Sequence, residues 1–169
     1  MLKKMLEDCG AIKYGDFTLT SGKKSSYYVD IKLASTDPEI LKRIAKEMAP
    51  EVEGKKIAGM ELGAVPLAAA LSLEKGLPYI MVRKKSKGHG TGGRIEGKLE
   101  DGEKVTVVED VTTTGGSSVE TVEVLREAGA EVNKVLVVVD RKEGAEKKLE
   151  DIGVQLVPLI TADELVEED

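Results

Sequence analysis

The sequence has 169 residues, of which 41% are hydrophobic and 33% charged, and its formal net charge is −6. This length suits one domain with a single core, and the composition is typical of a folded rather than a disordered chain. The negative charge argues against a general nucleic-acid-binding surface. The lack of a signal peptide or of an apolar run of about 18 residues predicts a cytoplasmic protein without membrane contact, and the one cysteine, Cys9, excludes an internal disulfide.

The N-terminal part is predicted to form a small subdomain with its own strand pairing. An amphipathic helix is expected over residues 2–9, followed by strands at 17–20 and 27–31 around a Ser-Gly-Lys-Lys turn. Successive side chains of a strand point to opposite faces. One of the adjacent Tyr27 and Tyr28 is therefore expected to pack inside the hairpin and the other to be available to a ligand, and the sequence does not say which.

The rest of the chain is predicted to alternate between strands and helices. Asp37 and Pro38 are suited to begin a helix, and Gly129 is suited to end one. The expected strands cover residues 57–60, 79–82, 105–108, 135–139 and 154–159, and the expected later helices cover 65–75, 118–128 and 145–152. This pattern predicts an α/β fold with a central parallel sheet flanked by helices. Ligands in such folds bind at the carboxyl edge of the sheet. The loops expected at this edge follow residues 60, 82, 109 and 139.

Residues 105–118 predict a site for a sugar phosphate. An apolar strand ends at two adjacent acids, Glu109 and Asp110, and a turn rich in threonine and glycine leads into a helix near Ser117. The backbone N–H groups of such a turn and the positive end of the helix dipole bind phosphate. The two carboxylates would repel a bare phosphate, so we expect them to bind ribose hydroxyls or a hydrated Mg²⁺.

Residues 83–98, called the basic segment below, are rich in glycine and positive charge. A solvated loop is the simple interpretation, but its predicted place beside the phosphate turn favours a cationic lid over a polyanion. Its glycine spacings match the residue patterns of the dinucleotide-binding and Walker A motifs. Both motifs require a strand that turns directly into a helix, and this segment lacks that context, so we reject both matches. The side chains that supply charge or donors are Arg83, Lys84, Lys85, Lys87, His89 and Arg94.

Residues 109–117, after their valine-rich strand, resemble the phosphoribosyl pyrophosphate (PRPP) motif of type I phosphoribosyltransferases. Three further segments resemble the orotate phosphoribosyltransferases of that family. Residues 17–28 resemble their N-terminal hood, residues 83–90 their catalytic loop, and residues 140–144 their orotate-binding arginine segment. The resemblance covers nearly the whole chain. It implies one phosphoribosyltransferase domain over residues 1–169, with hood elements in 1–36 and the α/β core in 37–169.

This resemblance implies transfer of the 5-phosphoribosyl group from PRPP to orotate, giving orotidine 5′-monophosphate and pyrophosphate in the biosynthesis of UMP. It implies Mg²⁺ held mainly by PRPP, with no metal-binding side chain assigned, and a homodimer whose catalytic loop reaches the neighbouring subunit. One alternative is a phosphoribosyltransferase for a purine or uracil. Another is a non-catalytic regulator of the same fold that senses PRPP or nucleotides. The hood and catalytic-loop sequences favour orotate, and the chain has no spare basic face for a nucleic-acid-binding regulator.

The resemblance also implies roles for individual residues. Glu109 and Asp110 would hold the 2′- and 3′-hydroxyls of ribose, and Lys87 and Asp110 would be the catalytic residues. Arg141, with help from Thr113, would bind orotate. The residues expected to bind pyrophosphate are Arg83, Lys84, Lys87 and His89. The residues expected to bind the 5′-phosphate are Val111, Thr112, Thr113, Thr114, Gly115, Gly116 and Ser117.

Two positions depart from the pattern of some bacterial relatives, which have lysines where this chain has Thr20 and Gly63. Gly63 can still offer its backbone to pyrophosphate, but the side-chain charge at that position is lost. We therefore expect pyrophosphate binding to depend more strongly on the basic segment.

Overall fold

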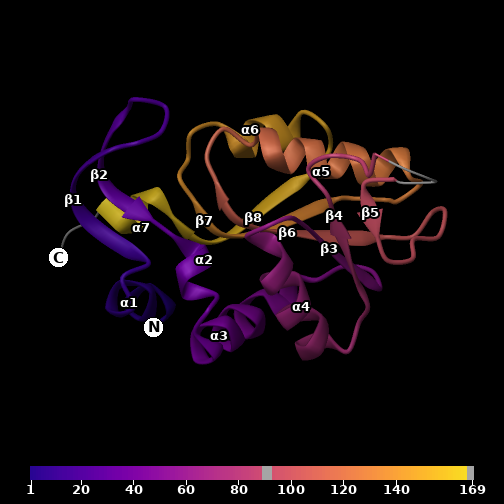
Figure 1. The fold of residues 1–169 in the computed structure, drawn as a ribbon, viewed down its shortest axis with the longest axis horizontal. Helices are drawn as coiled ribbons and strands as arrows, with labels where there is room; N and C mark the ends of the chain where they lie inside the picture. Colours follow the sequence, from indigo (N-terminus) through magenta and orange to yellow (C-terminus); the bar gives the residue numbers. More distant parts are fainter. Residues whose placement is uncertain (89–92, 167–169) are drawn as a thin grey trace.

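The computed structural model of the protein describes residues 1–88 and 93–166, which form a six-stranded sheet, a separate two-stranded sheet and the helices around them (Figure 1). The strand order in the large sheet is β5-β4-β3-β6-β7-β8, and every neighbouring pair is parallel except β4 and β5. The strands of this sheet are β3 (Lys56–Met60), β4 (Tyr79–Val82), β5 (Ile95–Glu96), β6 (Val105–Thr112), β7 (Lys134–Asp140) and β8 (Gln155–Thr161). The predicted class is therefore confirmed as α/β with a central, mostly parallel sheet.

Helices cover both faces of the large sheet, as predicted (Figure 1). α3 (Pro38–Met48) and α4 (Ala64–Lys75) lie on one face, and α5 (Gly116–Glu127) and α6 (Ala145–Glu150) lie on the other. The core divides accordingly into two aliphatic clusters, one on each face. The remaining described helices are α1 (Leu2–Asp8), α2 (Ile31–Ala34), the 3₁₀ helix η1 (Ala49–Glu51) and α7 (Ala162–Val166). Within the described ranges, no helix is both long and apolar enough to cross a membrane.

The small sheet pairs β1 (Ile12–Thr18) with β2 (Lys24–Val29) in antiparallel orientation, so the predicted hairpin is present, but the first strand covers residues 12–18 rather than the predicted 17–20. The prediction that the second strand runs to Ile31 is wrong. The Asp30 side chain accepts a backbone N–H of the following turn at 3.1 Å, so it caps α2 and the chain becomes helical there. Asp37 caps α3 in the same way, as predicted.

Two predicted boundaries at the ligand edge are also wrong. β6 continues past Val108 to Thr112, because its last residues still pair with β7, as Thr112 does with Asp140. The acid pair therefore lies inside the strand rather than after it. The basic segment is not wholly irregular, since Ile95 and Glu96 form an antiparallel edge strand beside β4.

The parallel strands bring their carboxyl ends to one edge of the sheet, as predicted. The ends of β3, β4, β6 and β7 are Met60, Val82, Thr112 and Asp140. Backbone hydrogen bonds join neighbouring ends: the N–H of Glu61 donates to the carbonyl of Val82, and the N–H of Arg141 donates to the carbonyl of Thr112, each at 2.9 Å. Residues that follow different strands are therefore held at fixed spacing along this edge.

We predict that Gly59→Ala lowers stability, because β3 and α4 pack closely at this glycine. A Cβ at Gly59 would lie 2.8 Å from the carbonyl oxygen of Ala64 and 3.1 Å from its Cβ. The helix would have to shift, so we expect the free energy of unfolding in urea to fall by roughly 1–3 kcal/mol. Gly116→Ala is the matched control, because a Cβ there would meet no described heavy atom within 4 Å. Equal unfolding midpoints for the two variants would contradict the close packing.

Candidate active site

Glu109 is a buried carboxylic acid in the interior of the sheet, 7% exposed. It accepts hydrogen bonds from the hydroxyl of Ser118 on α5 and from the backbone N–H of Asp110, both at 3.3 Å. Burial raises the pKa of Glu109 to about 8, and the adjacent carboxylate of Asp110 adds to the shift. Near neutral pH Glu109 is therefore predominantly protonated, so it can donate as well as accept a hydrogen bond.

Asp110 lies against the loop between β3 and α4, in which the Glu61–Leu62 peptide bond is cis. The backbone of Gly63 comes so near that a Cβ at this position would lie 2.1 Å from the Oδ2 atom of Asp110. A larger residue here would therefore require the Asp110 carboxylate to move from its present position. The Nζ atom of Lys32, a residue that the sequence analysis does not assign, lies 3.9 Å from the same oxygen.

The threonine- and glycine-rich turn ends at the N-terminus of α5. The buried hydroxyl of Thr112 donates to the Oδ1 atom of Asp140 at 2.9 Å and so ties β6 to β7. Gly115 has a φ of +86°, and a Cβ there would lie 2.8 Å from the Cα of Ala145, so the turn needs glycine at this position. The exposed residues of the turn are Thr113, Thr114, Gly116 and Ser117, and Val111 is half-buried. A helix N-terminus with exposed donors is an arrangement that binds phosphate.

Arg141 follows β7 directly and is buried. Its Nη2 atom donates to the hydroxyl of Ser25 on β2 at 3.0 Å, and its guanidinium carbon lies 4.3 Å from the ring centroid of Tyr27. Its Nε atom lies 3.6 Å from the Glu143 carboxylate. Among the buried side-chain nitrogen and oxygen atoms of the described residues, this Nε is the one without a hydrogen-bond partner. A buried cation with an unused donor is suited to an anionic, planar ligand.

A cavity of about 430 Å³ lies between the N-terminal hairpin and the ends of β6 and β7. Tyr28 lines this cavity and packs on Phe17 with ring centroids 5.8 Å apart, whereas Tyr27 is buried under Arg141. The two tyrosines thus divide as the strand alternation predicts, and the structure shows which one faces the cavity. Lys23 also lines it and brings a cation. The residues of the α/β part of the chain that line this cavity are Val111, Thr113, Thr114, Arg141 and Glu143.

The basic segment is bound to an acid of its own. The Nε atom of Arg83 donates to the Oε1 atom of Glu96 at 2.9 Å, and the Nζ atom of Lys87 pairs with the same oxygen. The hydrogen bond from Lys87, followed by that from Arg83, lowers the pKa of Glu96. Two predicted pyrophosphate ligands therefore have an internal anionic partner.

Arg94 and Lys84 of the basic segment contact acidic residues outside the segment. Arg94 donates from Nη2 to a carboxylate oxygen of Glu120 on α5 at 2.6 Å, so it fixes the base of the segment. The backbone N–H of Lys84 donates to the carboxylate of Glu61 at 2.7 Å. His89, a predicted pyrophosphate ligand, lies outside the described residues.

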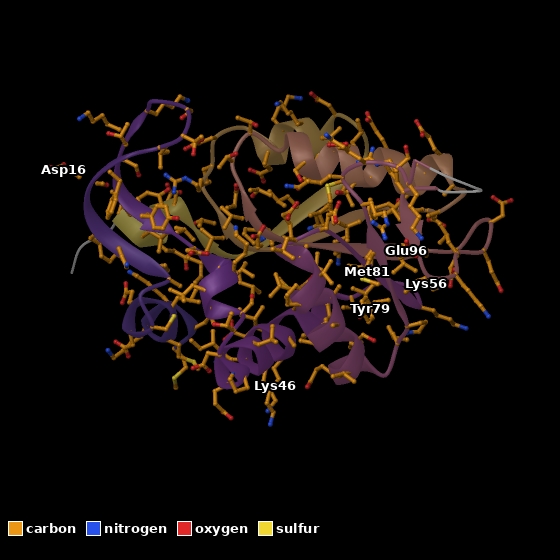
Figure 2. The ribbon with its side chains drawn as sticks, viewed as in Figure 1. Asp16, Lys46, Lys56, Tyr79, Met81 and Glu96 are labelled. Atoms are coloured by element: carbon orange, nitrogen blue, oxygen red, sulfur yellow. The ribbon has the colours of Figure 1, made fainter. Side chains whose placement is uncertain are left out.

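The described site residues form two groups along the carboxyl edge. The acid pair, the phosphate turn and Arg141 lie together on β6 and β7 and in the segments that follow these strands, whereas Glu96 and its cations lie at the β5 end. Figure 2 shows Glu96 beside Met81, its partner on β4, and Asp16 of the hairpin at the opposite end of the molecule. Adjacent strands lie about 4.8 Å apart, so β6 is roughly 14 Å from β5 and roughly 10 Å from β4, which Arg83 follows directly. The structure therefore brings the predicted ribose, phosphate and base ligands together, while Arg83 and Lys87 are paired with Glu96 on the β5 side of the sheet.

Four residues of the site are not predicted from the sequence, and the reasons differ between them. Glu96 carries a signal that could have marked it, since it is the only acid in the basic segment. Ser118 and Lys32 carry none, because their contacts with the acid pair depend on where α5 and α2 pack. Lys23 follows the hairpin glycine, and only the curve of the hairpin over the core brings it to the cavity.

Comparisons with known proteins agree with this geometry. The family model of the phosphoribosyl transferase domain matches residues 35–163. The orotate phosphoribosyltransferase of Methanosarcina mazei is 53% identical over 164 residues, which cover 95% of this chain and 88% of that protein.

Solved structures give the same result. The crystal structure of orotate phosphoribosyltransferase from Aeropyrum pernix matches with a TM-score of 0.87 and 38% identity, over 99% of this chain and 97% of that one. The Mycobacterium tuberculosis orotate phosphoribosyltransferase in complex with PRPP matches with a TM-score of 0.77 and 30% identity, over 97% of this chain and 98% of that one.

We predict that Glu109→Gln changes how stability depends on pH. The folded pKa of about 8 lies above the ordinary value of 4.5, so the folded state retains a proton that the unfolded state releases. The contribution of Glu109 to the free energy of unfolding is fully present below about pH 4.5. It is lost as the pH rises through about 8, at up to about 1.4 kcal/mol per pH unit. In urea unfolding from pH 4.5 to 9, the free energy of unfolding of the variant should rise relative to that of the wild type as the pH rises. The exposed Glu127→Gln is the control, and parallel pH profiles for wild type and Glu109→Gln would contradict the raised pKa.

Proposed function

The chain belongs to the orotate phosphoribosyltransferase family, and from this premise we propose which of its residues carry each part of the reaction. The reaction is the transfer of the 5-phosphoribosyl group of PRPP to orotate, which gives orotidine 5′-monophosphate and pyrophosphate in pyrimidine biosynthesis. One observation carries the assignment. A buried arginine with an unused donor lines a cavity beside an acid pair and a phosphate-binding turn.

The activity is tested by following the loss of orotate absorbance after addition of PRPP and Mg²⁺ to the purified protein. We expect turnover with orotate, none with adenine or uracil in its place, and loss of turnover when a chelator removes Mg²⁺. Turnover with a purine base or uracil but not with orotate would contradict the proposed base specificity.

The PRPP half of the site is assigned to β6 and the start of α5. The 5′-phosphate binds the turn from Val111 to Ser117 through backbone N–H groups and hydroxyls, favoured by the positive end of the helix dipole. The ribose hydroxyls bind Glu109 and Asp110. A protonated Glu109 donates to one hydroxyl while Asp110 accepts from the other, so the raised pKa of Glu109 suits a ligand that both donates and accepts.

The orotate half is assigned to Arg141 and the N-terminal hairpin. Orotate is a planar anion, and a guanidinium can bind its acceptors with two parallel hydrogen bonds. The buried position of Arg141 strengthens this interaction, because less water competes for the charge. Thr113 supplies a second polar contact, and Tyr28 is placed to cover the ring from the hairpin side.

We assign Mg²⁺ to the diphosphate of PRPP rather than to a protein cage. Mg²⁺ takes oxygen ligands in octahedral geometry and retains several waters, so one or two carboxylates and substrate phosphates suffice. In the part of the chain that the structure describes, no group of three histidine, cysteine or acidic side chains could hold a metal ion, while the carboxylate of Asp110 offers oxygen atoms. These residues fit a metal that arrives with PRPP, and its chemistry is to neutralise charge on the leaving pyrophosphate.

The difficult step is the breaking of the bond between C1′ and the pyrophosphate oxygen. Negative charge grows on the pyrophosphate, and positive charge grows on the ribose ring. The negative charge of orotate lies on its carboxylate, so its ring nitrogen loses a proton as it forms the new bond to C1′. The departing pyrophosphate, which gains negative charge as the C1′–O bond breaks, can accept that proton. We assign Lys87, with Arg83 and Lys84, to stabilise the departing pyrophosphate, and the carboxylate of Asp110 to favour the developing positive charge on ribose.

The basic segment is assigned to the active site of the neighbouring subunit in a homodimer. Within one chain its cations Arg83 and Lys87 are paired with Glu96 of β5, and β5 lies three strand spacings, roughly 14 Å, from β6, which leads into the PRPP turn. A neighbouring subunit that places this segment over the PRPP turn would complete the site.

We predict that Lys87→Ala lowers kcat by about 10²-fold or more, on the scale of one lost transition-state donor. Steady-state kinetics with saturating orotate and PRPP would measure the change, with Lys75→Ala on α4 as the control. Near-normal turnover of the Lys87 variant would contradict its catalytic role.

The same variant tests the shared site. Mixing inactive Lys87→Ala with inactive Asp110→Asn under conditions of subunit exchange should restore part of the activity, because hybrid dimers contain one site with both native residues. An absence of recovery in demonstrated heterodimers would contradict a site built from two subunits.

We predict that Arg141→Lys raises the KM for orotate about tenfold or more and leaves the KM for PRPP nearly unchanged. Lysine retains the charge but loses the planar fork, so about one charge-assisted hydrogen bond is lost. Arg126→Lys is the matched control, because Arg126 donates to the backbone carbonyls of Val132 and Ile152 away from the cavity. Equal increases in both KM values would point to a general loss of structure instead.

A further inference from the structure

We propose that Glu96 is an internal competitor of pyrophosphate, whose carboxylate occupies Arg83 and Lys87 until a diphosphate displaces it. The inference rests on the proposed role of Lys87 and adds a residue to it. Glu96 would act as a positioning residue, because it acts on the reaction through the two cations rather than by contact with the reacting atoms.

The geometry places one carboxylate oxygen between two cations. The Oε1 atom of Glu96 accepts from the Nε atom of Arg83 at 2.9 Å and also pairs with the Nζ atom of Lys87. Glu96 pairs with Met81 across β5 and β4, so it lies on the edge strand of the sheet, and Figure 2 shows the two residues near each other. A cavity of about 400 Å³ adjoins this cluster, and its lining includes Glu61 of the loop after β3.

This cluster is exposed enough to exchange its anion. The side chains of Glu96, Arg83 and Lys87 are 31%, 40% and 47% exposed, and ion pairs in such positions are weak. A diphosphate carries more negative charge and more acceptor oxygens than one carboxylate, so it can replace Glu96 on either cation. The pair is therefore suited to hold the cations in the absence of ligand and to release them when pyrophosphate arrives.

The base of the basic segment does not depend on Glu96. The N–H of Arg83 donates to the carbonyl of Arg94 at 2.6 Å, and the Nε atom of Arg94 donates back to the carbonyl of Arg83 at 2.9 Å. Arg94 is also held by Glu120. Neutralising Glu96 would thus free two side chains without releasing the backbone that carries them.

The consequence for the reaction is a lower affinity for diphosphates than the cations alone would give. Each cation must leave the carboxylate before it can bind pyrophosphate fully. The same carboxylate helps the product to depart, because it takes the cations back as pyrophosphate leaves. Glu96 would therefore lower the affinity for PRPP and for pyrophosphate while leaving the orotate cavity unaffected.

The test is the dissociation constant of inorganic pyrophosphate with Mg²⁺, measured by titration calorimetry on the whole enzyme. Glu96→Gln retains the shape of the side chain and removes its charge, so we expect binding to tighten about two- to fivefold and the KM for PRPP to fall, with the KM for orotate unchanged. A purely structural role would give the opposite sign, because a damaged site binds more weakly.

Two further variants make the result decisive. The exposed Glu100→Gln carries the same change in net charge outside the cluster and should leave binding unchanged. In the double variant Glu96→Gln/Lys87→Ala, the gain from Glu96→Gln should shrink toward the part due to Arg83. Unchanged or weaker binding in Glu96→Gln, or equal tightening in Glu100→Gln, would overturn the proposal. Unchanged pyrophosphate binding in Lys87→Ala alone would instead overturn the assigned role of Lys87.

Discussion

The burial of Glu109 in the interior of the sheet is the constraint on which the rest of the site depends. A carboxyl group in this position is costly unless it is protonated or hydrogen-bonded, and here both conditions hold. Its partners are Ser118 on α5 and the backbone of Asp110, so the same contacts fix the start of the helix relative to the end of β6. The group that would bind ribose and the helix end that would bind phosphate are thereby held as one unit.

The second constraint is the close approach of two loops at the carboxyl edge. Gly63 and Gly115 both lie where a Cβ would collide, the first with the Asp110 carboxylate and the second with the backbone of Ala145. Gly63 lets the loop after β3 approach Asp110 inside β6, and Gly115 lets the turn after β6 approach the start of α6. At Gly63 a Cβ would require the Asp110 carboxylate to move, and the amine of Lys32 lies 3.9 Å from the same carboxylate.

The sequence predicted those parts of the fold that local pattern determines. The apolar strands, the caps at Asp37 and Gly129 and the phosphate turn all depend on neighbours in the chain, and all occur as expected. The length of β6 and the presence of β5 could not be predicted in this way, because they depend on pairing with β7 and β4. The same holds for Lys23 and Ser118, whose importance arises only when distant segments pack together.

β5 has a consequence beyond the site. An unpaired edge of a parallel sheet is a template to which a strand of another molecule can add. Here β4 is covered by a partner of two residues, Ile95 and Glu96, with the charged Arg94 directly before it and Lys98 two residues after it. So short and charged a strand is a poor template for further pairing. The segment that carries the proposed pyrophosphate ligands therefore also protects the sheet against edge-to-edge aggregation, and we expect that shortening it would lower solubility as well as turnover.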